Sequence, residues 1–404
     1  MYFKNNKFYV EKIEGLKIVK RYGTPTYCYS LNKLKKNIEN FQLNFKSINP
    51  LICFSVKSNN NLQILKKIRK SGMGADVVSK GEMIQALKAG ISPNKIVFSG
   101  VGKNTEELKF AMEKKILLIN AESESEVIEI ERLARLKKNI VNIGLRLNPN
   151  IDAKTLKKIS TGKHEDKFGL TEKNFLNLLN NFKDSKFLNI KCLSVHIGSQ
   201  ITDYKPYSKM INVLDRIINK SNHVFDYIDL GGGMGIQYEK KTKSFNYKKY
   251  NLIIKNFLKK HDVKIIFEPG RSIIANSAVL LTQIIYIKNT NKKSFIILDA
   301  AMNDLMRPAL YGSYHSIIPL LKNNKKNKKI HDFVGPVCET TDKFLSIKGF
   351  QSLKEKDFIA ISDVGAYGMS LSSNYNLRPK PVELMVDKKS VKVILKRQKL
   401  FNII

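Results

Sequence analysis

The sequence predicts an α/β protein in which an eight-stranded (β/α)8 barrel is followed by a mainly antiparallel β domain. Eight short apolar runs occur at near-even spacing before Arg271, most of them separated by segments of helical periodicity, and the sequence after Arg271 becomes β-rich. The chain has 404 residues, 43% of them hydrophobic. This length suits a barrel of about 250 residues plus a second domain, with enough apolar material for both cores.

Each predicted barrel strand is a run of apolar residues that ends near Gly, Asn or Ser. The runs cover residues 51–56, 75–79, 95–100, 116–120, 142–149, 190–199, 225–232 and 264–270. Segments such as 61–72, 81–90 and 104–115 have the spacing of amphipathic helices. Strands that alternate with helices imply right-handed βαβ units and a parallel sheet, and eight units most simply close into a barrel. A doubly wound open sheet is the alternative.

The second domain is predicted from five apolar runs with little helical sequence between them. They cover residues 278–288, 294–300, 331–338, 357–365 and 382–397. The last run contains the turn sequence DKKS, which predicts a β-hairpin. We therefore expect a barrel domain over residues 25–271 and a β domain over 272–404, joined by strands from residues 1–24 such as KFYVEKI.

The formal charge of +36 raises the question of a nucleic-acid or membrane partner. Only ten of the 71 basic residues are arginines, and the lysines are spread along the whole chain. Arginine is the preferred reader of phosphates and bases, so this composition favours a solvated lysine-rich surface. We expect neither a nucleic-acid nor a membrane partner.

The cysteines and the N-terminus indicate a cytoplasmic protein. Cys28, Cys53, Cys192 and Cys338 are far apart in the sequence, with no CxxC pair and no Cys/His cluster at metal-binding spacing. The first residues lack the apolar core of a signal peptide, and no run has the length of a membrane span. We expect no disulfide framework and no bound metal.

Residues with chemical potential collect where the predicted barrel strands end. They are Lys57, Asp76, Ser79, His196, Ser199, the glycines 231, 232, 233 and 235, Glu268, Gly270 and Arg271. A lysine at a strand end is often only solvated, and a histidine such as His196 is often a core residue. In a barrel of this type, however, chemistry takes place at the carboxyl ends of the strands, and phosphate is often held after strands seven and eight. The shared location of these residues therefore predicts one site.

This set of residues matches the requirements of pyridoxal phosphate. The amine of Lys57 can condense with the aldehyde, and the glycine N–H groups, with Arg271, can hold the phosphate. The imidazole of His196 can lie flat against the ring. Glu268 can keep the pyridine nitrogen protonated, so that the ring withdraws electrons from the reacting carbon.

Six ordered motifs, FSVKSN, HIGSQ, DLGGGMG, EPGR, VGPVCETTD and GAYGMSLSSNYNLRP, make the chain resemble the fold-type III pyridoxal-phosphate decarboxylases, in detail the diaminopimelate decarboxylases. The resemblance spans about Gly23 to Glu383. It implies that Lys57 carries the cofactor, His196 stacks on its ring and Glu268 meets the pyridine nitrogen. The implied cofactor-binding residues are Lys57, Asp76, His196, Ser199, Gly232, Gly233, Glu268, Pro269, Gly270, Arg271 and Tyr367. Ser58 stands where the family more often has alanine.

The same resemblance implies the substrate site and the assembly. The substrate-binding residues would be Arg271, Arg307, Tyr311, Glu339 and Tyr367, and Cys338 would be the proton donor, contributed with Glu339 by the neighbouring chain of a homodimer. A thiol suits this role because its ordinary pKa, about 8.5, lies close to working pH. The implied reaction converts meso-2,6-diaminoheptanedioate to L-lysine and carbon dioxide.

Two alternatives to this reaction stay open. Ornithine, arginine and carboxynorspermidine decarboxylases share the barrel and the lysine. Glu339, Arg307 and the SSNYNLRP stretch favour the diaminopimelate branch, because a second carboxylate on the substrate needs cationic or hydroxyl partners. A basic regulatory protein on an inactive barrel is the other alternative, but it gives no reason for Lys57, His196, Glu268 and Cys338 to occur together.

Overall fold

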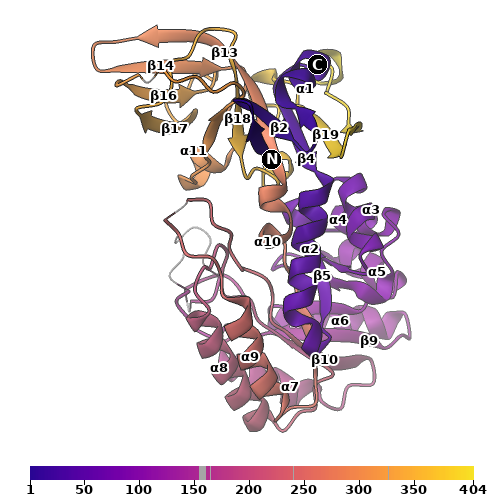
Figure 1. Cartoon of the computed structure of the whole chain (residues 1–404). Coiled ribbons are helices and arrows are strands. Elements are labelled where there is room, and N and C mark those ends of the chain that lie inside the picture. The colour runs from indigo at the N-terminus through magenta and orange to yellow at the C-terminus, as the bar shows by residue number, and fades with distance from the viewer. Residues whose placement is uncertain (154–160, 164, 240, 326) are drawn as a thin grey trace. The chain divides into compact units, whose positions relative to one another are not determined.

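The computed structural model describes residues 1–153, 161–163, 165–239, 241–325 and 327–404 (Figure 1). These residues form two compact units. The barrel unit comprises Asn40–Ile236 and Lys243–Arg271, and the sheet unit comprises Met1–Glu39, Gln237–Thr242 and Ser272–Ile404.

The barrel unit contains a closed barrel of eight parallel strands, which confirms the predicted fold class. The closed order is β10-β11-β12-β5-β6-β7-β8-β9. Every strand lies within or beside one of the eight apolar runs. The strands are β5 (Leu51–Ser55), β6 (Gly74–Val77), β7 (Ile96–Phe98), β8 (Leu118–Ala121), β9 (Val141–Arg146), β10 (Leu188–Ser194), β11 (Tyr227–Asp229) and β12 (Lys264–Phe267).

Helices connect the barrel strands and lie around them in Figure 1. They are α3 (Leu62–Lys70), α4 (Lys80–Lys88), α5 (Thr105–Glu113), α6 (Glu124–Leu136), α7 (Glu172–Phe182), α8 (Lys205–Ser221) and α9 (Tyr247–Leu258), while α2 (Leu31–Phe45) leads into β5. Most begin at a side chain that accepts a hydrogen bond from a backbone N–H of the first turn. The accepting residues are Asn61, Ser79, Asn104, Ser123, Thr171 and Asn246. Such N-caps stabilise a helix by about 1 kcal/mol each and fix where it starts.

The barrel interior changes from apolar to polar along the strands. Cys53, Val97, Leu118, Cys192 and Ile266 form a buried apolar cluster. Because side chains of a strand alternate between its two faces, the residue two positions further along points into the same interior. At all five positions that residue is polar: Ser55, Ser99, Asn120, Ser194 and Glu268. A polar layer therefore lies above the apolar one, toward the carboxyl ends of the strands.

The sheet unit contains a nine-stranded, mainly antiparallel sheet, as predicted. Seven strands follow the order β17-β16-β14-β13-β4-β19-β20, while β18 pairs with β13 and β15. The strands are β4 (Thr26–Ser30), β13 (Ala278–Asn289), β14 (Lys293–Leu298), β15 (Ile317–Pro319), β16 (Ile330–Val334), β17 (Lys343–Lys348), β18 (Phe358–Ser362), β19 (Val382–Asp387) and β20 (Ser390–Leu395). The DKKS sequence forms the turn of the β19–β20 hairpin.

The N-terminal residues contribute to the sheet unit in a way that differs from the sequence expectation. KFYVEKI supplies part of a small sheet made of β1 (Tyr2–Lys4), β2 (Lys7–Val10) and β3 (Ile13–Glu14). The strand that enters the large sheet is β4, which pairs with β13 and β19. All five residues of β4 are buried, so it forms a central strand of that sheet.

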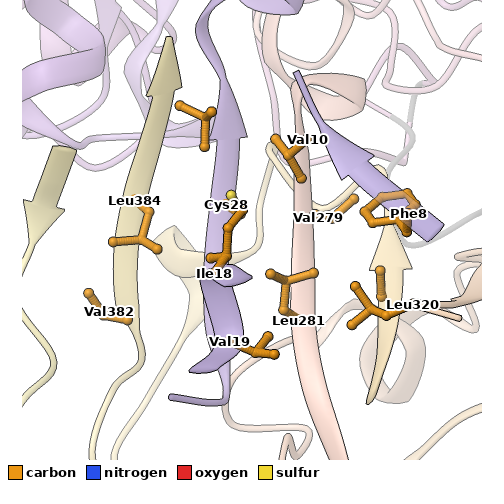
Figure 2. Close-up of a cluster of buried hydrophobic side chains, with 12 residues drawn as sticks. Phe8, Val10, Ile18, Val19, Cys28, Val279, Leu281, Leu320, Val382 and Leu384 are labelled. Atoms are coloured by element: carbon orange, nitrogen blue, oxygen red, sulfur yellow. The ribbon is translucent and has the colours of Figure 1, made fainter. Parts of the chain in front are cut away.

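The core of the sheet unit lies where β2 and the helix α1 (Gly15–Tyr22) meet the large sheet (Figure 2). The two remaining helices of the described chain are short: α10 (Arg271–Ile274) and α11 (Arg307–Tyr311). Twelve buried residues make up the cluster: Phe8, Val10, Ile18, Val19, Cys28, Val279, Leu281, Leu320, Ala360, Val382, Leu384 and Val386. Burying each of the larger side chains stabilises the fold by about 1.5–3 kcal/mol, which anchors the N-terminal segment to this unit.

Candidate active site

The candidate lysine stands at the end of a barrel strand, as its sequence position predicts. Lys57 lies in a short 3-10 helix, Val56–Ser58, that follows β5 directly. Its Nζ is 3.0 Å from Oδ2 of Asp76 on β6, and its side chain is 36% exposed, whereas that of Asp76 is fully buried. The same Asp76 oxygen accepts a 2.6 Å hydrogen bond from the Ser55 hydroxyl. The aspartate therefore holds the lysine amine at the carboxyl end of the barrel.

Glu268 and Asp229 form a buried pair of carboxyl groups beside that amine. Glu268 is 6% exposed and Asp229 is fully buried. Burial, then the charges of Asp229 and Asp76, raises the pKa of Glu268 well above its usual range. Burial also raises the pKa of Asp229 to about 6, although hydrogen bonds from Gly231 and Glu268 oppose the rise. The pair therefore retains a proton more readily than two separate carboxyl groups would.

The proton of this pair belongs on Glu268. The Asp229 carboxylate accepts hydrogen bonds from the Gly231 N–H at 2.9 Å, from Nδ2 of Asn120 at 3.0 Å and from the Ser194 hydroxyl at 3.4 Å. These donors stabilise its ionised form. Glu268 is then the donor in the hydrogen bond that joins the two carboxyl groups.

His196 follows β10 and is held as a neutral ring. Its Nδ1 is 3.1 Å from the backbone N–H of Gly232. Because an amide N–H can only donate, Nδ1 accepts and the ring proton lies on Nε2. Burial, then the positive charges of Arg146 and Lys57, lowers the pKa of His196 well below its usual range. A flat, uncharged face is the surface that a cofactor ring requires.

The glycine run after β11 tolerates no side chain. A Cβ on Gly232 would lie 2.1 Å from the Glu268 carbonyl oxygen, and one on Gly233 would lie 2.3 Å from that of Gly198. Gly233 also has a φ of +88°, which favours glycine. The run therefore packs against the segments that follow β10 and β12.

The EPGR turn brings further predicted residues to the same end of the barrel. The Ser55 N–H donates to the Pro269 carbonyl at 3.2 Å, and a Cβ on Gly270 would lie 2.8 Å from the Ser58 side chain. Arg271 donates a 2.9 Å hydrogen bond from Nη2 to the Ser199 hydroxyl. Ser79, by contrast, caps α4 by accepting from the Glu82 N–H, so its observed role is structural.

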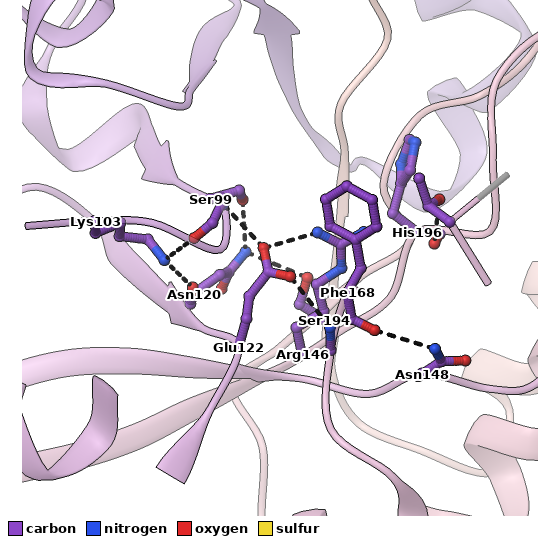
Figure 3. Close-up of polar contacts among 12 residues, drawn as sticks. Ser99, Lys103, Asn120, Glu122, Arg146, Asn148, Phe168, Ser194 and His196 are labelled. Carbon is purple, nitrogen blue, oxygen red and sulfur yellow. Dashed lines mark hydrogen bonds and ion pairs between the residues drawn. The ribbon is translucent and has the colours of Figure 1, made fainter. Parts of the chain in front are cut away.

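This end of the barrel also holds a second buried polar cluster, which the sequence motifs did not predict (Figure 3). Glu122 accepts hydrogen bonds from Nη1 of Arg146 at 2.8 Å and from the Gly100 N–H at 2.9 Å. The Phe168 ring lies 4.9 Å from the Arg146 guanidinium carbon. Lys103, whose side chain is only 1% exposed, binds Glu126 at 2.6 Å and two backbone carbonyl groups. These contacts fix the loops after β7, β8 and β9.

The period of two along the strands could have identified the missed residues. Asp229, Asn120 and Arg146 are polar residues within otherwise apolar strand runs, where a charge or amide is costly unless it is paired. The sequence prediction names residues at and beyond the strand ends, and these three are not among them.

The other predicted site residues lie in the sheet unit, and their burial differs from one to the next. Arg307 is buried, at the first position of α11, and Tyr311 ends that helix. Tyr367 has a φ of +56° and is partly buried. Cys338 and Glu339 are exposed on the loop after β16.

The loop that carries Cys338 is attached to the SSNYNLRP segment. The Tyr375 hydroxyl donates to the Glu339 carboxylate, and the Asn376 amide lies 3.7 Å from the Cys338 sulfur. Thr341 donates to the other Glu339 oxygen at 3.1 Å. The segment that suggested a substrate branch in the sequence therefore holds Glu339 and Cys338 in place.

The barrel residues fit a pyridoxal cofactor by the chemistry of their groups. The unit offers an amine at a strand end, a flat neutral ring, a buried acid and a glycine run with the adjoining EPGR turn. Asp76 Oδ1 is buried and has no partner among the described residues, so this layer retains capacity for a further polar contact.

Among the described residues no helix is both long and apolar enough to span a bilayer.

Comparisons with known proteins agree with these features. The sequence model of the family "Pyridoxal-dependent decarboxylase, pyridoxal binding domain" matches residues 31–275. A diaminopimelate decarboxylase of Helicobacter pylori is 42% identical over 382 residues, which cover 94% of each chain. One of Aquifex aeolicus is 36% identical over 400 residues, covering 98% of this chain and 94% of the relative. The crystal structure of a Helicobacter pylori diaminopimelate decarboxylase complexed with L-lysine superposes with a TM-score of 0.92 at 41% identity, covering 96% of this chain and 98% of that one.

Proposed function

We propose that this chain, which belongs to the diaminopimelate decarboxylase family, removes one carboxyl group from meso-2,6-diaminoheptanedioate to give L-lysine and carbon dioxide. The observation that carries this proposal is the convergence of Lys57, Asp76, His196, the Asp229–Glu268 pair and the glycine run at one end of the barrel. The bound pyridoxal phosphate supplies an electron-withdrawing ring that stabilises negative charge on the reacting carbon.

The barrel residues would hold and tune this cofactor. Lys57 Nζ would bind the aldehyde carbon, and Asp76 would orient the amine through their 3.0 Å contact. His196 would lie against the ring, and Glu268 would face the pyridine nitrogen and keep it protonated. The phosphate would be bound by the N–H groups of the glycine run and the EPGR turn, with Ser199, Arg271 and Tyr367. The full set is Lys57, Asp76, His196, Ser199, Gly232, Gly233, Glu268, Pro269, Gly270, Arg271 and Tyr367.

The sheet unit would supply the substrate contacts. The proposed binding residues are Arg271, Arg307, Tyr311, Glu339 and Tyr367. An arginine that paired with the departing carboxylate would stabilise the ground state and slow its loss. We therefore assign Arg307 to the carboxylate that the product retains, while Glu339 would bind the remote ammonium group.

Cys338 would protonate the reacting carbon from its Sγ after carbon dioxide has left. Its exposure, together with that of Glu339, supports a role on a second copy of the chain in a homodimer, so that each site needs two chains. The four cysteines are free, which fits the reducing cytoplasm in which we propose that the enzyme works.

The experiment that tests the substrate measures carbon dioxide release from meso-diaminopimelate, ornithine, arginine and carboxynorspermidine at equal concentrations. We expect release from diaminopimelate to exceed the others by at least about 10³-fold, because buried arginine partners are left unpaired when a substrate lacks the second carboxylate. Equal turnover of ornithine or arginine would contradict the assignment. Salt-dependent nucleic-acid binding without any turnover would favour the inactive-barrel alternative.

A further inference from the structure

His315, a histidine of the sheet unit with no role in the proposed site so far, lies in direct contact with Arg307. His315 is 1% exposed and Arg307 is 4% exposed. Nη1 of Arg307 is 2.7 Å from Nε2 of His315. The other ring nitrogen, Nδ1, is 2.8 Å from the Ser362 carbonyl oxygen at the end of β18. The imidazole therefore links the end of a sheet strand to the guanidinium.

The two contacts determine where the ring proton lies. A carbonyl oxygen can only accept a hydrogen bond, so Nδ1 of His315 carries the proton and donates it. The neutral ring then has its lone pair at Nε2, where a guanidinium, which can only donate, is the matching partner. The chain of donors runs from Arg307 through His315 to Ser362, without a mismatch.

Arg307 makes two further contacts on the same unit. The Tyr238 ring lies 4.7 Å from the guanidinium carbon, and Nη2 lies 3.3 Å from the Ser313 hydroxyl. Tyr238 and His315 meet edge to face, with ring centres 5.4 Å apart. The guanidinium plane is thus fixed by an aromatic face and by a nitrogen acceptor. A fixed plane matters because arginine binds a carboxylate through two parallel hydrogen bonds.

We propose that His315 is a positioning residue that orients Arg307 for the carboxylate that the product retains, and so contributes to the choice of a dicarboxylate substrate. This inference rests on the proposed function, since Arg307 has a carboxylate to bind only if the substrate or product carries one. His315 itself need not touch the substrate. Its effect should therefore appear only with ligands that bear that carboxylate.

A matched pair of variants separates the two contacts of His315. In His315→Gln the side-chain oxygen lies near the place of Nε2 and can still accept from Arg307. In His315→Asn the amide N–H lies near the place of Nδ1 and can still donate to Ser362, but the Arg307 contact is lost. Both variants replace a buried polar ring with a smaller amide, so their general cost to folding is similar.

The experiment measures inhibition of the cofactor-loaded enzyme by L-lysine and by pentane-1,5-diamine, which is L-lysine without its carboxylate. For His315→Asn we expect the inhibition constant of L-lysine, and the KM for diaminopimelate, to rise about tenfold or more, the usual effect of losing a hydrogen bond to a charged group. For His315→Gln the rise should stay within about threefold. Neither variant should change inhibition by the diamine by more than about twofold.

A double variant tests whether His315 acts through Arg307. In an Arg307→Gln background, adding His315→Asn should not weaken L-lysine binding further, because the group that it orients is gone. A further tenfold loss would overturn the proposal. So would equal loss for L-lysine and the diamine, or the same L-lysine affinity in the Asn and Gln variants. If the wild-type enzyme does not bind L-lysine more tightly than the diamine, the proposed function itself fails, not the positioning role alone.

Discussion

The barrel residues proposed to hold the cofactor and the loop proposed to carry the proton donor differ in burial. In the barrel unit these groups are mostly buried and joined by short contacts, such as Lys57 to Asp76 and His196 to Gly232. In the sheet unit, Cys338 and Glu339 are exposed on a loop. A buried, cross-linked set is already arranged for a cofactor, whereas exposed residues can meet the rest of a site only when another surface covers them. We therefore expect cofactor binding and the proposed proton donation to respond separately to mutation.

The largest expected effect is that of Lys57→Ala. This variant removes the amine that would bind the cofactor, so turnover should fall by about 10⁴-fold or more. The long-wavelength absorbance band of the bound cofactor should also disappear. Spectroscopy and a carbon dioxide assay measure both effects, and Lys66→Ala, at an exposed position of α3, is the control. An unchanged band in Lys57→Ala would contradict the assignment of Lys57 as the residue that binds the cofactor.

Cys338→Ala should distinguish the proposed proton donation from cofactor binding most clearly. Cofactor absorbance should stay as in the wild type, while turnover of diaminopimelate falls by about 10²- to 10⁴-fold, the usual contribution of a proton donor. Steady-state kinetics with a parallel spectrum make the measurement. Unchanged turnover would refute the donor role of the thiol.

Mixing Lys57→Ala chains with Cys338→Ala chains tests whether each active site takes residues from two chains. If each site takes Lys57 from one chain and Cys338 from the other, a mixed dimer has one intact site out of two. Random pairing should then restore about a quarter of wild-type activity. The absence of recovery, with mixed dimers shown to form by mass spectrometry, would count against a shared site.

Gly232→Ala should damage the barrel unit more mildly. The added Cβ would lie 2.1 Å from the Glu268 carbonyl oxygen, so backbone must shift at an expected cost of about 1–3 kcal/mol. Cofactor affinity should weaken by about 10- to 100-fold, which a fluorescence titration can measure. Gly102→Ala is the control, because nothing lies within 4 Å of its Cβ. Equal affinities in both variants would show that the glycine run does not approach the cofactor.

The mildest effect should come from the Asp229 carboxyl, which takes up a proton of its own beside the protonated Glu268. The pKa of Asp229 is raised from 3.8 to about 6, so the folded chain binds more protons than the unfolded chain in this range. Its contribution to stability is complete below about pH 4 and is lost as the pH rises through 6. Asp229→Asn should remove about 1–3 kcal/mol of this pH dependence from the cofactor-free protein.

Urea unfolding between pH 4 and 7 measures that dependence. Asp226→Asn, which alters an exposed ion pair with Lys191, provides the control. A slope in Asp229→Asn that equals the wild-type slope would mean that burial does not raise the pKa of Asp229 in the folded chain.

The eight barrel strands were predictable because each buried parallel strand is a short apolar run with a polar end. The DKKS hairpin was predictable from its turn residues. In contrast, β4 (TYCYS) and β17 (KFLSIK) were not predicted, because their sequences carry few aliphatic residues and only their pairing in the sheet makes them strands.

Like the strands of the fold, only some residues of the candidate site were predictable from the sequence. Motif residues such as Lys57, His196 and Glu268 were located, and the structure brings them to one unit. Asp229 and Asn120 were missed, although their place two residues after an interior apolar position marks them. His315 could not be inferred at all, since its contact with Arg307 depends on how β15 and β18 pair.

Dependence of turnover on pyridoxal phosphate can be measured with protein from which the cofactor has been removed. Release of carbon dioxide and L-lysine from meso-diaminopimelate should be negligible without pyridoxal phosphate and should return when it is added, in equal molar amounts of the two products. Failure of the wild-type protein to bind pyridoxal phosphate, or the same turnover with and without it, would show that the barrel site does not use this cofactor for decarboxylation.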